Sequence, residues 1–280
     1  MRVIFTIIIC LLLSSCSSQF AYRHLDWIIA WYSDDYLDLN RQQEKVLEVE
    51  LSQLLNWHEQ SQLPKYRDQL TAILNDLSAL PLSEDTITQH IHDIFQHWHV
   101  MRRHVSDRLP TLISQLKPKQ IDYLFKQLNE RNQQRLNDYQ ALTAEEAKEE
   151  KLERTEDLLI DWLGSITATQ ASVLLDFINK QQDTTVERVT YLRAYQETLK
   201  AAMLSPVNRP LLLNILNNPD EFKSQTYKAI QLANQNNTVV FIRELSIHLQ
   251  PEQVLHLRDK IQGYINTLNE LIQSSTKKGD

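Results

Sequence analysis

Apolar residues recur along most of the chain at alternating steps of three and four, the spacing of one face of an α-helix. A β-strand that buries one face would need an apolar residue at every second position instead. Two of these stripes are Ile87, Ile91, Ile94, Trp98, Met101 and Val105, and Val254, Leu257, Ile261, Tyr264, Leu268 and Leu271. Because each such helix must bury its stripe against another helix, the pattern predicts an all-α protein without a sheet. We expect an antiparallel multi-helix bundle or stacked helical hairpins.

Proline and glycine mark the ends of these helices. Breaks are predicted at Leu63-Pro64, Leu80-Pro81, Gly164, Ser205-Pro206 and Asn218-Pro219, which gives about ten to twelve helices joined by short connections. The chain has only 3 Gly and 8 Pro in 280 residues, whereas sheets joined by tight turns need many of both. The sequence also contains no glycine-rich phosphate loop. Composition therefore favours the same all-helical class.

A short motif opens several of the predicted helices, with an aliphatic residue, a polar N-cap, and Gln or Glu three residues after the cap. It occurs at residues 39–43, 116–120, 142–146, 166–170 and 249–253. In such a capping box the N-cap side chain and the Gln or Glu side chain each satisfy a backbone N–H of the first turn. Lys117 and Gln250 are poor N-caps, so their copies are expected to form only part of the box.

The four glutamines of this motif suggest an internal duplication. Their separations are 77, 50 and 83 residues, for Gln43, Gln120, Gln170 and Gln253. These intervals are no solenoid period. They would fit two similar halves, at about 16–140 and 166–280, joined by a charged helix from Thr143 to Leu163.

Residues 1–15 have the pattern of an export signal, with Arg2 before an apolar run from Val3 to Leu13. A helix of this run rises about 16 Å, half of a bilayer core, so it is too short to span one. Leu13-Ser14-Ser15-Cys16 resembles the lipobox of bacterial lipoproteins. The resemblance implies cleavage before Cys16, acylation of Cys16, and a body of residues 16–280 tethered to the outer membrane and facing the periplasm. The structural alternative is a buried apolar N-terminal helix with an incidental cysteine.

Charge and cysteine content exclude several function classes. The chain has 29 basic and 36 acidic side chains and no basic stripe, which argues against binding of nucleic acid. Cys10 leaves with the signal, so the mature chain cannot form an internal disulfide. We find no Ser-His-Asp context and no nucleotide loop. We therefore lean away from an enzyme and expect no cofactor besides the covalent lipid, although catalytic groups drawn from separate helices leave no spacing signature.

Histidines gather on one predicted helix, at His90, His92, His97, His99 and His104. His90, Asp93 and His97 follow one another at steps of three and four, which places them on one flank of that helix. With a ligand from a neighbouring helix they could hold Zn²⁺ or a similar metal. The alternative is that these histidines are partly buried and form hydrogen bonds with neighbouring helices.

Trp27 and Trp31 lie in an aromatic segment close to the predicted lipid anchor. Tryptophan is favoured in the headgroup region of a membrane, so we consider the two side chains as membrane-interface contacts. The alternative is that this segment packs on the bundle, which the acidic residues that follow it favour.

Several segments resemble a family of bacterial lipoproteins known only as a domain of unknown function. These segments are the lipobox, Tyr22 to Trp27, Trp31 to Leu39, Trp57-His58, Leu63 to Tyr66, Leu116 to Gln120, and Trp162 to Gly164. The resemblance implies an all-helical fold and leaves the activity blank. The capping motif is also similar to the LTxxQ signature of periplasmic stress-response proteins, which are helical chaperones and metal-responsive regulators.

These observations lead to a hypothesis about function. We expect a lipid-anchored envelope protein that acts without catalysis, as a binding, scaffold or chaperone-like module with a protein partner or client. The alternative is a metal-binding or metal-sensing periplasmic protein that uses the helix from His90 to His104.

Overall fold

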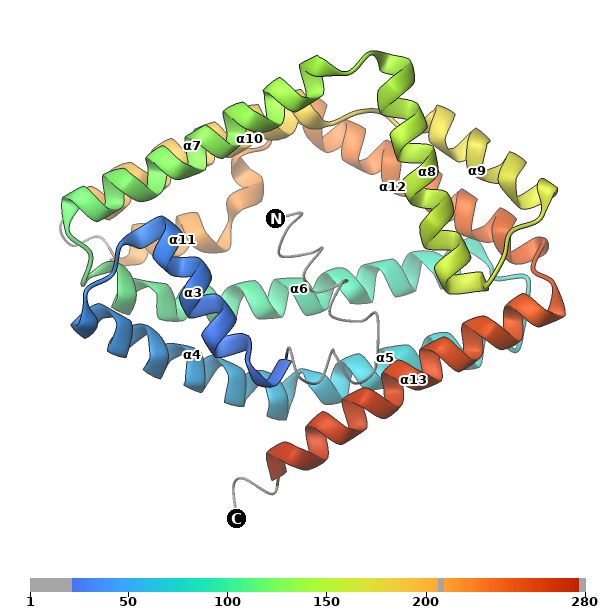
Figure 1. Ribbon diagram of the computed structural model, residues 1–280, viewed down its shortest axis with the longest axis horizontal. Coiled ribbons are helices and arrows are strands. Elements are labelled where there is room, and N and C mark those ends of the chain that lie inside the picture. Colours follow the sequence, from blue (N-terminus) through green and yellow to red (C-terminus); the bar gives the residue numbers. More distant parts are fainter. Residues whose placement is uncertain (1–21, 206–208, 277–280) are drawn as a thin grey trace. The chain divides into compact units, whose positions relative to one another are not determined.

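The computed structural model describes residues 22–205 and 209–276, and every regular element in them is a helix (Figure 1). The predicted all-α class is confirmed, with no strand in these two ranges. The chain forms two compact units. The first contains the residues up to Asn75, Asp93–Leu116 and the residues from Arg258 onward, and the second contains Asp76–His92 and Lys117–Leu257.

The first unit begins with α3 (Leu25–Leu37), which contacts α4 (Arg41–Ser61). The next helix, α5 (Leu63–Asp76), continues α4 almost without interruption. Gln62 keeps right-handed helical angles between them, and its backbone N–H donates to the carbonyl of His58. The break predicted at Leu63-Pro64 is therefore slight, because proline in the first turn of α5 removes no intrahelical hydrogen bond.

Two long helices contribute to both units, namely α6 (Glu84–Ile113) and α13 (Pro251–Thr276). Within the first unit α6 runs antiparallel to α4 and α5. Contacts of α4 and α5 with α6, and with the turn just after it, join residues 43 with 115, 50 with 108, 57 with 104, and 66 with 97. Since one number rises while the other falls, the helices run in opposite directions.

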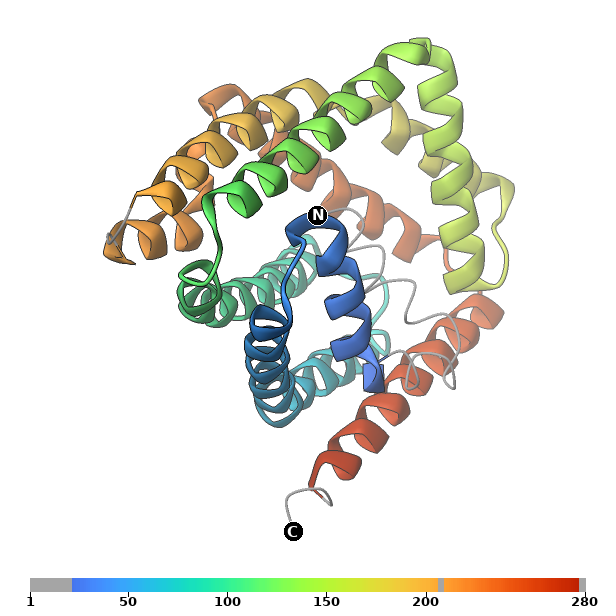
Figure 2. The same cartoon turned by 60° about the vertical axis from the view of Figure 1, so that its left-hand side comes forward.

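The second unit contains the remaining helices, one of them a short 3₁₀ helix. They are α7 (Pro118–Ala141), α8 (Ala144–Leu163), α9 (Ala168–Lys180), α10 (Thr185–Leu204), α11 (Arg209–Asn217), η1 (Pro219–Phe222) and α12 (Gln225–Ile247). α7 and α10 lie side by side in both views (Figures 1 and 2). Their contacts join residues 122 with 200 and 133 with 193, so they are antiparallel.

The core of the second unit lies between α9 and α12. Its buried members are Leu174, Ile178, Phe241 and Leu245, and partly buried residues of α8 pack against them. The rings of Phe177 and Phe241 stack with centroids 4.1 Å apart. Burying a side chain of this size contributes about 1.5–3 kcal/mol, so the apolar stripes hold this unit together as the spacing predicted.

The capping motif forms where the sequence predicts it. The side chains of Asn40, Thr143 and Thr167 accept hydrogen bonds from the first turns of α4, α8 and α9, and each box is complete. At Lys117 and Gln250 only the glutamine half forms, because the backbone N–H of each donates to Oε1 of the glutamine three residues on. Lysine has no acceptor atom to complete the box.

Among the helices of residues 22–205 and 209–276, none combines the length and the apolar content needed to span a bilayer. Gly164 ends α8 in the left-handed conformation (φ 79°), as predicted for this break.

The predicted signal and the acylation residue, Cys16, lie outside the described residues.

Candidate functional site

A row of polar and aromatic side chains lines the face of α4 and α5 that meets α6. His58, Gln62 and Tyr66 follow at intervals of four, which keeps them on one face of the nearly continuous helix. Nδ1 of His58 lies 2.8 Å from the hydroxyl of Tyr22. The ring of Tyr66 meets the ring of His97 edge-on, at a centroid distance of 5.1 Å. We name these five residues the histidine–tyrosine row.

Burial keeps the members of this row uncharged. It lowers the pKa of His58 to about 4 and raises the pKa of Tyr66 to about 12. The pKa of Tyr22 is also raised, by burial first and by the nearby carboxylate of Glu59 second. At neutral pH the row therefore consists of neutral imidazoles and phenols, which can exchange hydrogen bonds without any separation of charge.

Two buried atoms in this region have no hydrogen-bond partner among the residues that the structure describes. They are Oε1 of Gln62 and Nε2 of His97. Burial, together with the positive charge of Lys65, lowers the pKa of His97, and the carboxylate of Asp93 opposes this shift. Buried polar atoms nearly always have a hydrogen-bond partner. These two atoms therefore destabilise the packing in the region of α5 and α6.

A second polar cluster lies further along the same pair of helices. The ring of His104 stacks on Trp57 with centroids 3.6 Å apart and an interplanar angle of 8°. Nε of Arg108 donates to Nε2 of His104 at 3.2 Å, which makes that nitrogen an acceptor and leaves the ring neutral. Arg108 also donates to Glu50 at 3.1 Å and to Gln53 at 2.7 Å. Burial and the charge of Arg108 lower the pKa of His104.

The chemistry of both clusters is hydrogen bonding and ring packing between helices. One sequence pattern indicates that His58 is buried. It continues the apolar stripe of Leu47, Leu51 and Leu54 and must therefore face the protein interior. The partners of His58 could not be identified from that stripe. Tyr22 comes from another segment, and only the fold brings it to His58.

The three residues predicted to bind a metal lie on α6. Nε2 of His90 is 2.8 Å from Oδ2 of Asp76 at the end of α5. His97, seven residues further on, packs against Tyr66. Considering the described residues alone, no three His, Cys, Asp or Glu side chains are grouped so that they could hold a metal ion. A metal at His90, Asp93 and His97 stays a prediction, which equilibrium dialysis against Zn²⁺ would test.

The two tryptophans predicted to contact a membrane are largely exposed. Trp27 and Trp31 on α3 expose 65% and 62% of their surface. The neighbouring Ile28 and Ile29 are only partly exposed, on a helix that contacts α4. The contact of Trp27 and Trp31 with a membrane stays a prediction.

Two glutamines of the capping motif form a reciprocal pair of side-chain hydrogen bonds in the second unit. Nε2 of Gln170 donates to Oε1 of Gln253 at 2.7 Å, and Nε2 of Gln253 donates to Oε1 of Gln170 at 2.9 Å. Each Nε2 also donates to a carbonyl just before the other helix, at His248 and at Ser165. The motif therefore joins two helix starts to each other as well as capping each one.

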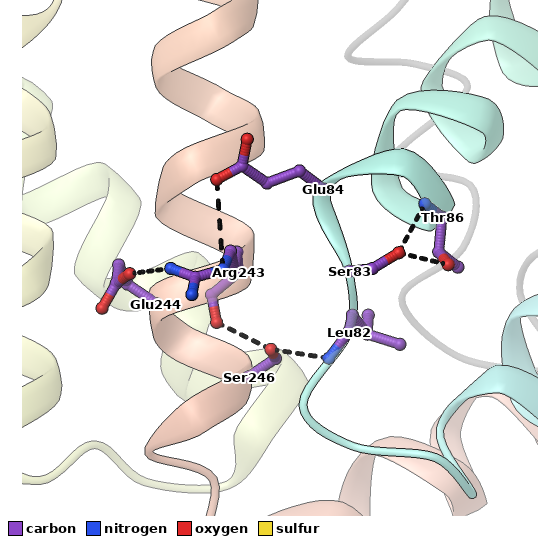
Figure 3. A network of polar contacts seen from close by, with 7 residues as sticks. All are labelled: Leu82, Ser83, Glu84, Thr86, Arg243, Glu244 and Ser246. Carbon is purple, nitrogen blue, oxygen red and sulfur yellow. Dashed lines mark hydrogen bonds and ion pairs between the residues drawn. The ribbon is translucent and has the colours of Figure 1, made fainter.

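The loop before α6 is tied to α12 by a small polar network (Figure 3). The backbone N–H of Leu82 donates to Oγ of Ser246 at 3.0 Å, and that hydroxyl donates to the carbonyl of Arg243 at 2.7 Å. Arg243 also lies 3.9 Å from Glu84 in the first turn of α6. These contacts hold the start of α6 against α12 within the second unit.

The chain belongs to DUF6279, a family of unknown function, whose model matches residues 35–228. No curated protein and no solved structure matches it. The expected membership of a family without an assigned activity is confirmed. The lipoprotein features and the similarity to LTxxQ stress proteins stay predictions.

Proposed function

We propose that this member of a family of unknown function is a lipid-anchored envelope protein that binds a protein partner or client without catalysis. Its body would face the periplasm from the outer membrane, held by acyl chains on Cys16. It would act as a scaffold or a chaperone-like module.

The observation that carries the binding role is an exposed aliphatic stripe on α12. Leu232, Val240 and Ile247 expose 59%, 42% and 43% of their surface. At 100° per residue the three positions fall within an arc of about 80° of the helix. Apolar side chains repeated along one helix face are the anchors by which an amphipathic helix docks against another protein.

The capping motif gives independent support to a chaperone-like role. Its boxes start α4, α8 and α9, and its glutamines join helix starts in the second unit. The motif is similar to the signature of LTxxQ stress proteins, which include helical chaperones of the periplasm. Such chaperones bind clients without covalent chemistry, in line with the exposed stripe on α12.

Site-specific photocrosslinking in intact cells tests the binding role. A photoreactive residue at position 232 or 240 should give discrete adducts with another envelope protein. The same residue in place of Glu149, an exposed polar position on α8, is the matched control and should give none. Equal labelling at all three positions, or none at positions 232 and 240, would argue against a binding surface on α12.

Mass spectrometry of the mature protein tests the anchor separately. The N-terminal peptide should begin at Cys16 and carry the added mass of the acyl chains. An unmodified N-terminus on a protein recovered from the soluble fraction would refute the anchor while leaving the crosslinking result valid.

A further inference from the structure

α3 presents two large aromatic side chains to solvent on one side. Trp27 and Trp31 are spaced by four, so they lie nearly above one another about 6 Å apart along the helix axis. Both expose more than half of their surface, although tryptophan is among the side chains that proteins bury most on average. The two rings thus form a pair that the first unit leaves uncovered.

The opposite side of α3 is already engaged. Leu25, Ile28 and Ile29 are partly buried on a helix that contacts α4. The hydroxyls of Tyr32 and Tyr36 lie 3.2 Å apart, and their rings are 5.2 Å apart. Because this face satisfies the packing of the helix, the two tryptophans are not needed to hold α3 in place.

Charged residues of both signs are exposed near the pair. Arg23 precedes it on the side toward the predicted anchor, Asp26 lies directly before Trp27, and Asp35 follows one turn beyond Trp31. A cation is favoured near anionic headgroups, and a carboxylate is favoured further out in water. At 100° per residue Asp26 points about 100° away from Trp27 around the helix, so its carboxylate can stay in water while the tryptophans contact a phospholipid surface.

Covalent geometry keeps the pair close to the lipid anchor. Five residues lie between Cys16 and Tyr22, so the six steps of the chain can span at most about 20–22 Å even when fully extended. The polar zone of a bilayer is about 5–8 Å deep on each side of its hydrocarbon core. A body tethered this tightly brings α3 repeatedly to the surface of the membrane.

We infer that α3 is a membrane-contact helix, and that Trp27 and Trp31 insert into the headgroup region of the phospholipid leaflet that holds the acyl chains. The occupant of this uncovered face is the membrane itself, and the inference rests on the proposed acylation of Cys16. With the acyl chains on Cys16 and the tryptophans on α3 both in the membrane, the first unit has a fixed side toward the membrane. A lipid tether alone would leave the body free to rotate.

Quenching of tryptophan emission by brominated lipid tests this contact. The acylated mature protein is reconstituted into vesicles of phosphatidylethanolamine and phosphatidylglycerol, with or without bromine on the acyl chains. Two of the five tryptophans should be quenched, so emission should fall by roughly a third in the brominated vesicles. The Trp27→Ala/Trp31→Ala variant should show almost no quenching, with unchanged circular dichroism.

A matched control removes exposed apolar side chains elsewhere. Leu158→Ala/Leu255→Ala changes residues of the second unit that expose 48% and 62% of their surface, and it should be quenched like the wild type. If Cys16 carries the acyl mass but the wild-type emission does not respond to bromine, the inference is wrong and the anchor stands. Equal quenching of the wild type and the double tryptophan variant would also refute the inference and leave the anchor intact. If Cys16 carries no acyl mass, the anchor and the inference fall together.

Discussion

Acid should destabilise the first unit through its buried histidine, and two substitutions should remove the effect. His58 is held as a neutral ring beside the hydroxyl of Tyr22. Replacing both residues in Tyr22→Phe/His58→Phe keeps the ring packing and removes both hydrogen-bonding groups at once. Such a paired replacement is close to neutral for stability at pH 7.5, to within about 1 kcal/mol.

The size of the acid effect follows from the pKa of His58. It is about 4 in the folded chain and about 6.5 in an unfolded one. Between these values the unfolded chain binds a proton that the folded chain does not, so the free energy of unfolding falls as the pH drops. Since one unit of pKa corresponds to about 1.4 kcal/mol, the loss from pH 7.5 to 4.5 is about 2–3 kcal/mol for His58 alone. The pKa values of His97 and His104 are also lowered, which adds to the loss.

Urea unfolding followed by tryptophan emission at pH 7.5 and 4.5 measures this loss. The double variant should lose about 2–3 kcal/mol less than the wild type over that interval. His92→Phe, at an exposed position of α6, should lose as much as the wild type. An NMR titration of the His58 ring should have its midpoint near 4. A midpoint near 6.5, or equal losses in the double variant and the wild type, would refute the reasoning.

Three further substitutions test contacts of the fold by thermal or urea unfolding. Gly164→Ala should lower the free energy of unfolding by about 1–2 kcal/mol, because φ is +79° and the new Cβ would lie 3.2 Å from Nδ1 of His256. Gln170→Ala should cost about 2–3 kcal/mol because it leaves the buried amide of Gln253 without its partner. Adding Gln253→Ala should then cost less than its effect alone, which a double-mutant cycle would measure. Arg108→Ala should cost about 2 kcal/mol, because its half-buried carboxylate partner on α4 loses its cation.

Exposed neighbours provide the controls for these substitutions. Thr169→Ala in the first turn of α9 and Arg103→Ala on α6 change residues whose side chains are exposed, so each should stay within about 0.5 kcal/mol of the wild type. A Gln170→Ala or Arg108→Ala protein no less stable than its control would show that the contact contributes nothing.

The sequence predicts the local elements of this fold well because their causes are local. The stripe from Ile87 to Val105 lies within α6, and the motif at Thr167 forms a complete box at the start of α9. Gly164 ends α8 because only glycine adopts a left-handed conformation without strain. Each of these causes acts over one or two turns, so a short stretch of sequence contains it in full.

Contacts between distant segments could not be predicted in the same way. The stripe that contains His58 indicates only that its ring faces inward, and its hydrogen bond with Tyr22, 36 residues earlier, depends on how two segments pack. The same holds for Arg108, whose partners lie 55 and 58 residues away in the sequence. Periodicity along one helix contains no information on which helix faces it. The histidine–tyrosine row was therefore missed, although His58 lies on an apolar stripe and His97 on a helix that the pattern predicts.

The proposal of two similar halves gains an argument from the side-chain amides. Gln170 donates to the carbonyl of His248, and Gln253 donates to the carbonyl of Ser165. Each acceptor lies two residues before the N-cap of the helix that carries the other glutamine. Gln43, in the first half, donates at 2.6 Å to the carbonyl of Gln115, which lies two residues before the N-cap Lys117.

A capping box needs no such long-range bond, since its own two hydrogen bonds satisfy the first turn. Capping alone therefore does not explain why this extra hydrogen bond recurs. Its acceptor is each time the carbonyl two residues before an N-cap, in segments far apart in the sequence. Two similar halves, which stay a prediction, would account for it, because a copied pair of helix starts would retain its mutual contact. The compact units do not follow the two halves, since α6 and α13 contribute to both units.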